Sequence, residues 1–258
     1  MRANTTVATP ADINCQGNGA EYTLVGHKWF TSAPMSDAFL TLAQTPEGVS
    51  CFLVPRWLPD GTRNSGLRVM RLKDKIGDRA NASSEIEYHN AWAVMLGNPG
   101  RGVRTIVEMV VHTRLDCTIG SAALMRLSAQ HAAHHVANRR AFGKSLAEAP
   151  LMRTVLSDLA VETEAANATW ARLARAFSPA PTATPQVVEH EGAIRRLATA
   201  IGKYWVCKRT VSVVYEAMEC LGGNGYVEEG PLARLYRQAP LNAIWEGSGN
   251  VIALDILR

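Results

Sequence analysis

The stretch GNPGRG, residues 97–102, divides the sequence into two parts of different character. Glycine and proline end the strand-type pattern that precedes it, and an apolar period typical of a helix follows. We therefore predict two domains, residues 1–98 and residues 99–258. A glycine-rich stretch can also bind phosphate, but this one has neither the spacing of a nucleotide-binding loop nor a parallel βαβ pattern around it, so phosphate binding here is the less favoured interpretation.

The first 98 residues contain short runs of β-type residues separated by Gly, Pro and Asp turns. The segment SEIEYH, residues 84–89, alternates polar and apolar residues, which predicts a strand with one solvated and one buried face. The whole pattern is typical of an antiparallel sheet. Other strand-type runs lie at residues 22–24, 28–31, 38–43 and 49–54.

Beyond the boundary, apolar residues recur at helical spacing in three long segments. The first runs from 103 to about 140, and the second runs from 152 to 177, before a proline-rich segment. The third ends at LGG, residues 221–223, a typical glycine C-cap. A fourth helix begins near Gly249. We predict an α+β fold, an antiparallel β domain followed by an antiparallel helical bundle that is truncated in its last helix.

Apolar residues of the third helical segment follow alternating steps of three and four, which predicts a seam packed against neighbouring helices. Because the fourth helix is so short, we expect part of this seam to be uncovered. The seam consists of Ile194, Leu197, Ile201, Tyr204, Val211, Tyr215 and Met218.

Composition limits the classes of function. A formal net charge of +4 is too small for a dedicated nucleic-acid domain, and the apolar runs are shorter than the roughly 20 residues of a membrane span. The N-terminal residues lack a secretory pattern, which suggests either a cytoplasmic protein or a chain cut in the middle, and we expect no membrane partner. Five scattered cysteines with no CxxC spacing favour free thiols over disulfides or a zinc site.

Several segments, far apart in the sequence, resemble motifs of the acyl-CoA dehydrogenase family, in the family's order. They are YTLVGHKWFTS (22–32), RRAFGK (139–144), ECLGGNGY (219–226) and IWEGSGN (244–250). The resemblance covers nearly the whole chain. It implies FAD-dependent α,β-dehydrogenation of a short or branched acyl-CoA. The segment RLKDKIG (71–77) is similar to that of the AidB-like branch of this family, whose members are flavoproteins tied to the DNA alkylation response.

In the first motif, the resemblance places Trp29 against the flavin, assigns Phe30 to the cofactor site, and lets the Thr31 hydroxyl bond the ring edge at N5. An aromatic wall excludes water from a hydride path, and a hydroxyl can donate to a ring nitrogen. Aromatic residues are also common in strands, so Trp29 and Phe30 as ordinary strand core is an open alternative.

In the second motif, the resemblance implies that Arg139 contacts the FAD pyrophosphate of a neighbouring subunit and that Phe142 packs beside the cofactor. A guanidinium presents a planar fork of donors to phosphate oxygens. A cation at a helix C-terminus also complements the macrodipole, which is the alternative role for Arg139. In the third motif, Gly222 and Gly223 would let the backbone approach the dinucleotide. Two further cofactor-binding residues are assigned beyond it, Ser248 and Asn250.

Glu246 takes the position of the family's catalytic base. The resemblance implies that its carboxylate removes the α-proton, while its backbone N–H helps to polarise the thioester carbonyl. Taken alone, Glu246 would be interpreted as a solvated surface carboxylate, because Glu is rarely buried. Some family members carry the base on the first bundle helix instead. That position corresponds to Thr113 here, which cannot act as a base.

The resemblance also concerns the assembly. It implies a homotetramer, a dimer of dimers with FAD at a subunit interface, and it indicates that an N-terminal helical domain and the rest of the last helix belong to a longer parent. We therefore expect the 258-residue chain by itself not to be a competent enzyme.

Two alternatives remain open. The first is a flavoprotein that protects double-stranded DNA by binding it, since the third helical segment carries a group of cations. The second is a metal at His131, His134 and His135, which share a helix face, although no carboxylate lies one turn away to complete a site. The cations are Arg195, Arg196, Lys203, Lys208 and Arg209, for which a solvated helical face is the ordinary interpretation.

Overall fold

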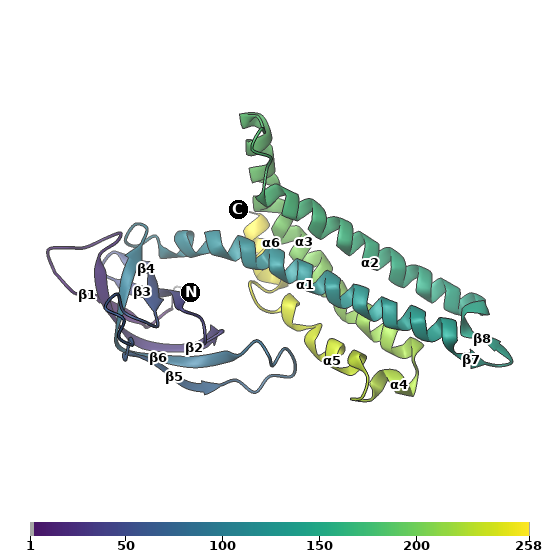
Figure 1. The fold of residues 1–258 in the computed structure, drawn as a ribbon. Coiled ribbons are helices and arrows are strands. Elements are labelled where there is room, and N and C mark those ends of the chain that lie inside the picture. Colours follow the sequence, from purple (N-terminus) through teal and green to yellow (C-terminus); the bar gives the residue numbers. More distant parts are fainter. Residues whose placement is uncertain (1–2, 258) are drawn as a thin grey trace. The chain divides into compact units, whose positions relative to one another are not determined.

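The structure, a computed structural model, describes residues 3–257 and divides into two compact units (Figure 1). The first unit ends at Met109 and the second begins at Val110, so helix α1 (Gly102–Asn138) contributes to both. The last strand of the first unit ends at Leu96. Because a β unit is followed by a helical unit, the predicted α+β fold is confirmed. Each unit is described separately.

The β unit is a barrel. Its six strands follow the order β2-β1-β3-β4-β6-β5, and an additional pairing of β2 with β6 closes the ring. Every strand pairing is antiparallel except that of β1 with β3, which is parallel and was not expected from the sequence. The strands are β1 (Val7–Pro10), β2 (Glu21–Ser32), β3 (Ala38–Thr45), β4 (Gly48–Pro55), β5 (Leu67–Leu72) and β6 (Ser83–Leu96).

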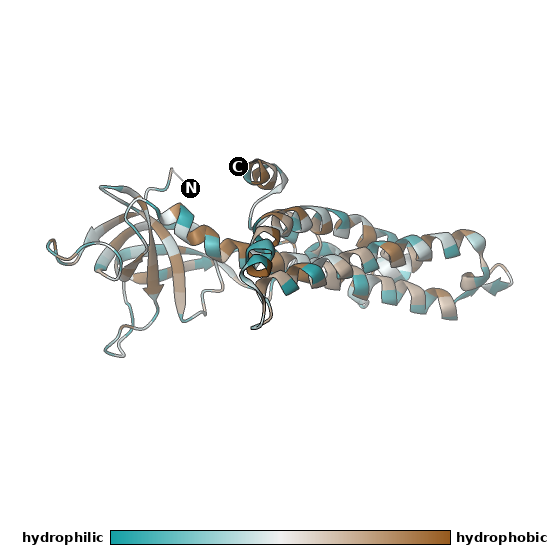
Figure 2. Cartoon of the chain, turned by 90° about the horizontal axis from the view of Figure 1, so that it is seen from above, coloured by the Kyte–Doolittle hydropathy of each residue, from teal (hydrophilic) through white to brown (hydrophobic). Residues whose placement is uncertain are grey.

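The barrel interior is filled by apolar side chains from alternating strand positions, as the period of two predicts. Phe52, Ile86 and Met95 are fully buried, and the Tyr22 ring meets the edge of Phe52 at a centroid distance of 5.2 Å. Figure 2 shows hydrophobic residues along the strands of this unit. Residues 84–89 lie in a strand as predicted, but the expected alternation of solvated and buried faces is not observed, since Ser84, Glu85, Ile86 and Tyr88 are all buried.

The register of β2 against β6 is interrupted at the aromatic motif. Lys28 pairs with Ile86 and Thr31 pairs with Ser84, so β2 carries one extra residue between these two pairs. Such a β-bulge bends the strand and redirects side chains. Trp29 and Phe30 occupy the bulge and are 57% and 68% exposed. The alternative that these two aromatics belong to the strand core is therefore wrong.

The helical unit contains the three long helices that the sequence predicts. Helix α2 (Pro150–Phe177) begins with proline, which suits the first turn of a helix. Helix α3 (Pro185–Cys220) begins after Thr184, whose side chain accepts a hydrogen bond from the N–H of Val187. The shorter elements are β7 (Arg140–Ala141), β8 (Lys144–Ser145), η1 (Leu146–Glu148), α4 (Gly223–Tyr226), α5 (Pro231–Gln238), η2 (Leu241–Ala243) and α6 (Gly249–Ile256).

The buried face of α3 differs from the predicted seam. Leu197, Ile201, Tyr204 and Tyr215 are between 43% and 53% exposed, as expected for an uncovered stripe, whereas Met218 is buried. The side chains that face the core follow another row of three- and four-residue steps, and several of them are polar. This row consists of Thr199, Lys203, Val206, Thr210, Val213 and Ala217.

Within residues 3–257, no helix is both long and apolar enough to cross a membrane. The same residues contain no group of three or more His, Cys, Asp or Glu side chains arranged to hold a metal ion. Among the cysteines, Cys15 is exposed, and the other four are buried with free thiols.

Candidate active site

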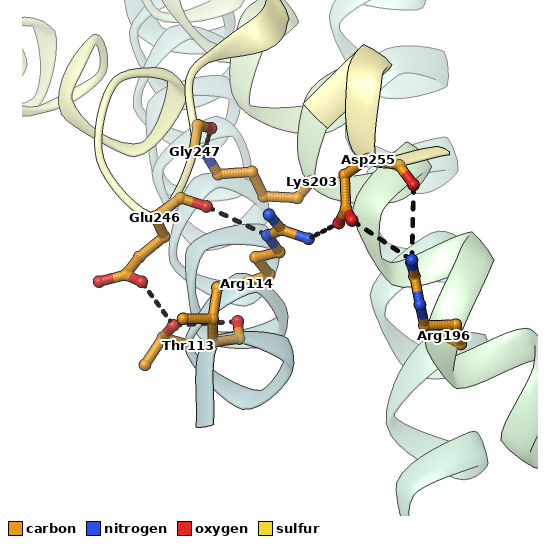
Figure 3. A network of polar contacts seen from close by, with 8 residues as sticks. Thr113, Arg114, Arg196, Lys203, Glu246, Gly247 and Asp255 are labelled. Atoms are coloured by element: carbon orange, nitrogen blue, oxygen red, sulfur yellow. Dashed lines mark hydrogen bonds and ion pairs between the residues drawn. The ribbon is translucent and has the colours of Figure 1, made fainter. Parts of the chain in front are cut away.

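Glu246 lies in the short loop between η2 and α6, half-buried against helix α1. The Thr113 hydroxyl donates a hydrogen bond of 2.8 Å to Glu246 Oε2 (Figure 3). By the resemblance, Thr113 corresponds to the position at which some family members carry the base. The two alternative base positions therefore meet at one place, with a carboxylate on the loop and a hydroxyl on the helix.

The backbone at Glu246 has an unusual conformation. Its φ is +56°, and Gly247 follows at +100°. Glycine adopts positive φ easily, whereas a residue with a Cβ rarely does so. A strained residue of this kind persists when its surroundings fix it, and such residues concentrate at functional sites.

Two buried cations hold this loop. Lys203 Nζ of α3 donates to the carbonyl oxygens of Trp245 and Gly247, each at 2.6 Å. Arg114 Nε of α1 donates to the carbonyl oxygen of Glu246 at 3.1 Å. Three consecutive carbonyls therefore have cationic partners on two different helices, and Figure 3 shows those of Glu246 and Gly247 beside Arg114 and Lys203.

An outer layer of charge orients Arg114. Its Nη1 atom lies 2.7 Å from Asp255 Oδ2, and Arg196 Nη2 lies 3.3 Å from the other oxygen of the same carboxylate. The Arg114 side chain is 8% exposed, so loss of the Asp255 carboxylate would leave a buried positive charge without its counter-ion. Asp255 lies on α6, and the ion pairs thus connect α1, α3 and α6 beside Glu246.

Burial shifts the pKa values of a lysine and two cysteines next to the Glu246 loop. The side chain of Lys203 is 1% exposed, and burial lowers its pKa below the ordinary 10.5. Burial raises the pKa of the neighbouring Cys117 thiol to about 12, and it also raises the pKa of Cys207. Both thiols are therefore neutral near pH 7 and are poor nucleophiles.

Of the predicted flavin-contacting residues of the β unit, Thr31 is half-buried, whereas Trp29 and Phe30 are exposed and lie beside cationic side chains. Lys73 Nζ lies 3.1 Å from the centroid of the Trp29 ring and 4.8 Å from that of Phe30. Glu85 holds Lys73 at 2.5 Å and Arg71 at 2.6 Å, and these contacts lower the pKa of Glu85. One face of Trp29 is thus already covered by an ammonium group.

Arg139 and Phe142 lie where α1 ends. Arg139 is exposed directly after the helix, a place that also suits the alternative role beside the macrodipole. Phe142 and Gly143, with φ of 53° and 81°, form the two-residue turn of the β7–β8 hairpin. Phe142 is 98% exposed at its tip. An aromatic ring held so far from the core is available to a partner or a ligand.

The remaining predicted residues lie in two loops. Gly222 has φ +58° and ψ −141°, which favours glycine, and at both Gly222 and Gly223 a Cβ would meet no atom within 4 Å. The Gly223 surface is thus open to a ligand. Ser248 is the N-cap residue of α6, but its side chain makes no capping hydrogen bond, and Asn250 is exposed on the first turn.

The helical unit separates these residues along its length. Thr113 and Asn138 are 25 residues apart on α1, which corresponds to about 37 Å. Glu246, which contacts Thr113, is consequently far from Arg139. The hairpin β7–β8 and α4 lie toward the same end of this unit in Figure 1, away from α6. The unit brings Ser248 and Asn250 close to Glu246, but not Arg139, Phe142, Gly222 or Gly223.

The cations of α3 do not form the free patch that the DNA-binding alternative needs. Lys203 is buried, Arg196 pairs with Asp255, and Arg209 forms an ion pair with Glu162. Of the remaining two, Lys208 Nζ lies 5.6 Å from the Tyr204 ring centroid and Arg195 lies 5.8 Å from that of Phe177. Lys203 was wrongly interpreted from the sequence as part of a solvated face.

Both units match models of one protein family. Residues 3–91 match the middle domain of acyl-CoA dehydrogenases, and residues 100–258 match their C-terminal domain. The chain belongs to the acyl-CoA dehydrogenase family, whose members are oxidoreductases.

Among its relatives is AidB of Escherichia coli, 51% identical over 237 residues, or 92% of this chain and 42% of AidB. Glutaryl-CoA dehydrogenase of Desulfococcus multivorans is 30% identical over 94% of this chain and 61% of its own. The crystal structure of Caenorhabditis elegans ACDH-11 in complex with C11-CoA superposes with a TM-score of 0.89 at 32% identity, covering all of this chain and 44% of that one. The chain thus spans between two and three fifths of the length of these relatives.

Proposed function

We propose that the intact protein is an FAD-dependent acyl-CoA dehydrogenase in which Glu246 removes the α-proton of the thioester. The observation that carries this proposal is the Glu246 loop itself, strained at φ +56° and held through three consecutive carbonyls by Lys203 and Arg114. The Thr113 hydroxyl donates to Oε2 and leaves the other carboxylate oxygen, Oε1, as the proton acceptor.

The residues fit a flavin dinucleotide. The rings of Trp29 and Phe30 are more than half exposed, and although Lys73 covers one face of Trp29, they would offer an apolar wall. The open surface at Gly223 would admit a close ligand, and Arg139 would offer a guanidinium for phosphate oxygens. When bound, FAD supplies a two-electron acceptor for the substrate β-hydride. The Thr31 hydroxyl, half-buried on β2, would donate to the ring edge at N5, and Ser248 would donate to the cofactor through a hydroxyl that caps no helix.

Two copies of the chain would share each cofactor. About 37 Å of helix separates the Glu246 contact at Thr113 from the end of α1 next to Arg139, which is more than one flavin site spans. Arg139 and Phe142 would therefore serve the FAD of a neighbouring subunit, in a dimer of dimers. The 98% exposed Phe142 side chain supports this assignment, because an apolar ring at a hairpin tip gains most from a partner surface.

We assign the substrate class as acyl-CoA thioesters, short or branched in the acyl chain. The related ACDH-11 structure contains C11-CoA, so a substrate panel should extend from short branched chains to C11. The DNA-binding alternative has weaker support, since three of the five α3 cations that suggested it are buried or paired. Duplex binding by the intact protein that weakens steeply with salt would restore it.

The decisive experiment measures acyl-CoA-dependent bleaching of flavin absorption in the intact, FAD-reconstituted protein. Glu246→Gln keeps the shape of the side chain but removes the base, and is expected to lower the rate about 10²- to 10⁴-fold. The matched control is Glu229→Gln, which changes an exposed carboxylate of the same unit and should retain the wild-type rate. Wild-type turnover by Glu246→Gln would show that another group is the base. Failure of the wild-type protein to bind FAD would refute the flavoprotein assignment.

A further inference from the structure

The chemistry proposed for Glu246 leaves the role of a buried lysine open. Lys203 is 1% exposed in the helical core, and neither of its two carbonyl acceptors is a charged group. Burial of an ammonium group without a carboxylate partner is costly, so its place here requires a reason. Its two short hydrogen bonds flank one residue, Glu246.

The geometry of the peptide bond gives that reason. In a trans peptide, the C=O and the following N–H point in opposite directions. When Lys203 binds the carbonyl of Trp245, the N–H of Glu246 points away from Lys203, out of the helical core. The carbonyl of Gly247, held by the same Nζ, fixes the next turn of the loop in the same way. Positive φ at Glu246 is compatible with both bonds forming at once.

We propose that Lys203 is a positioning residue that aims the backbone N–H and the carboxylate of Glu246 at the thioester. The proposal rests on the proposed function of Glu246 as the base. Lys203 does not contact the substrate. It keeps two groups of Glu246 in fixed relation to each other: the backbone N–H, a hydrogen-bond donor for the thioester carbonyl oxygen, and the carboxylate, the acceptor for the α-proton. Pre-organised donors of this kind contribute most when they need not reorganise during the reaction.

Arg114 has a related but separable task. It holds the carbonyl of Glu246 from the opposite helix, and its guanidinium is itself fixed by Asp255. Arg114 therefore connects the loop to α6, whereas Lys203 determines the direction of the Glu246 N–H. For this reason the test uses Lys203 and leaves the ion pair between Arg114 and Asp255 intact.

The test compares Lys203→Met with Arg172→Met in the intact, FAD-reconstituted protein. Methionine keeps much of the length of the lysine stem but donates no hydrogen bond. Arg172→Met removes an ion pair of two hydrogen bonds with Glu191, a buried residue of α3, the helix that also carries Lys203. It should therefore match the loss of stability caused by Lys203→Met while leaving the Glu246 loop untouched. We expect Lys203→Met to lower kcat about 10- to 100-fold with little change in KM, because misplacement by about 1 Å costs this much. Arg172→Met should keep both constants.

A second measurement does not depend on activity. Hydrogen exchange, followed by mass spectrometry on the cofactor-free protein, should rise in peptides covering residues 244–250 of Lys203→Met and not in those of Arg172→Met. If Lys203→Met fails to fold, Lys203→Gln is measured instead. Its shorter side chain cannot reach both carbonyls, so kcat should still fall and exchange at residues 244–250 should still rise.

The outcomes are distinguishable. A folded Lys203→Met or Lys203→Gln protein with wild-type kcat and wild-type exchange overturns the positioning role, while an inactive Glu246→Gln protein leaves the proposed function standing. An active Glu246→Gln protein refutes the proposed function itself. Equal losses of kcat in Lys203→Met and Arg172→Met would show a general effect of α3 stability and would also overturn the positioning role.

Discussion

Because of Lys28, we expect the stability of the β unit to rise with pH in the alkaline range. It lies on β2 directly before the bulge, and its Nζ donates to Asn4 Oδ1 at 2.8 Å and to the carbonyl oxygen of Leu42 at 2.6 Å. Burial lowers the pKa of Lys28 from 10.5 to about 8. The folded protein therefore releases this proton at a lower pH than the unfolded chain does.

The sign follows from the proton balance. Below pH 8, Lys28 is charged in both states and the full cost of its burial opposes folding. Between about pH 8 and 10.5, the unfolded chain binds a proton that the folded protein has lost, so stability rises with pH. The difference between the two pKa values corresponds to at most about 3 kcal/mol, less whatever solvent reaches this half-buried side chain.

The assay is urea denaturation of the wild-type protein and of Lys28→Met at intervals from pH 7 to 10.5. Other groups titrate in this range, including thiols and tyrosines, but their contributions cancel in the difference between the two proteins. The wild-type protein should gain stability relative to Lys28→Met as the pH rises through 8. A difference that stays constant, or that falls with pH, would refute the assigned pKa of Lys28.

Three other substitutions test the packing and the ion pairs. Gly225→Ala should destabilise the helical unit by about 1–3 kcal/mol in denaturation experiments, because a Cβ there would lie 2.2 Å from a backbone oxygen of α3. Thr199→Val should stabilise the unit by about 1 kcal/mol, since the buried Thr199 hydroxyl has no hydrogen-bond partner among the described residues. Contacts with Arg71 and Lys73 lower the pKa of Glu85, so the stability advantage of the wild-type protein over Glu85→Gln should be complete above pH 4.5 and be lost as the pH falls through that lowered pKa.

The sequence predicts the order of the elements better than their connections. The runs at 22–24 and 28–31 were expected to be two strands, but they form one strand, β2, that continues through its bulge. The parallel pairing of β1 with β3 and the closure of the barrel by β2 and β6 depend on contacts between distant segments, for which local patterns carry no signal. Helices α4 and α5, of four and eight residues, are too short to show a helical period.

The candidate site was predictable only where a motif carries it. The resemblance singled out Glu246 and Thr113, and the structure brings their side chains within 2.8 Å of each other, whereas the role of Glu246 as the base stays a prediction. The strand pattern by itself did not predict that Trp29 and Phe30 are exposed, because one extra residue in a strand leaves no mark in composition or spacing. Only the resemblance, which assigns both residues to a cofactor site, required them to lie outside the strand core. Arg114 has no local signal either, since its acceptor is a backbone carbonyl 132 residues away.

Helix α3 shows why the buried lysine was missed. The predicted seam and the observed core row have the same alternating spacing but are offset by two residues, as Leu197 and Thr199 illustrate, which corresponds to about 200° around the helix. Hydrophobic periodicity assumes that the apolar row is the buried one. That assumption fails on α3 because Lys203 finds its partners in the carbonyls of the Glu246 loop, far away in the sequence. On this helix the row that contains the polar residues is buried and the predicted apolar row is half exposed, so a polar residue in a row of small side chains can mark a buried contact as well as a solvated face.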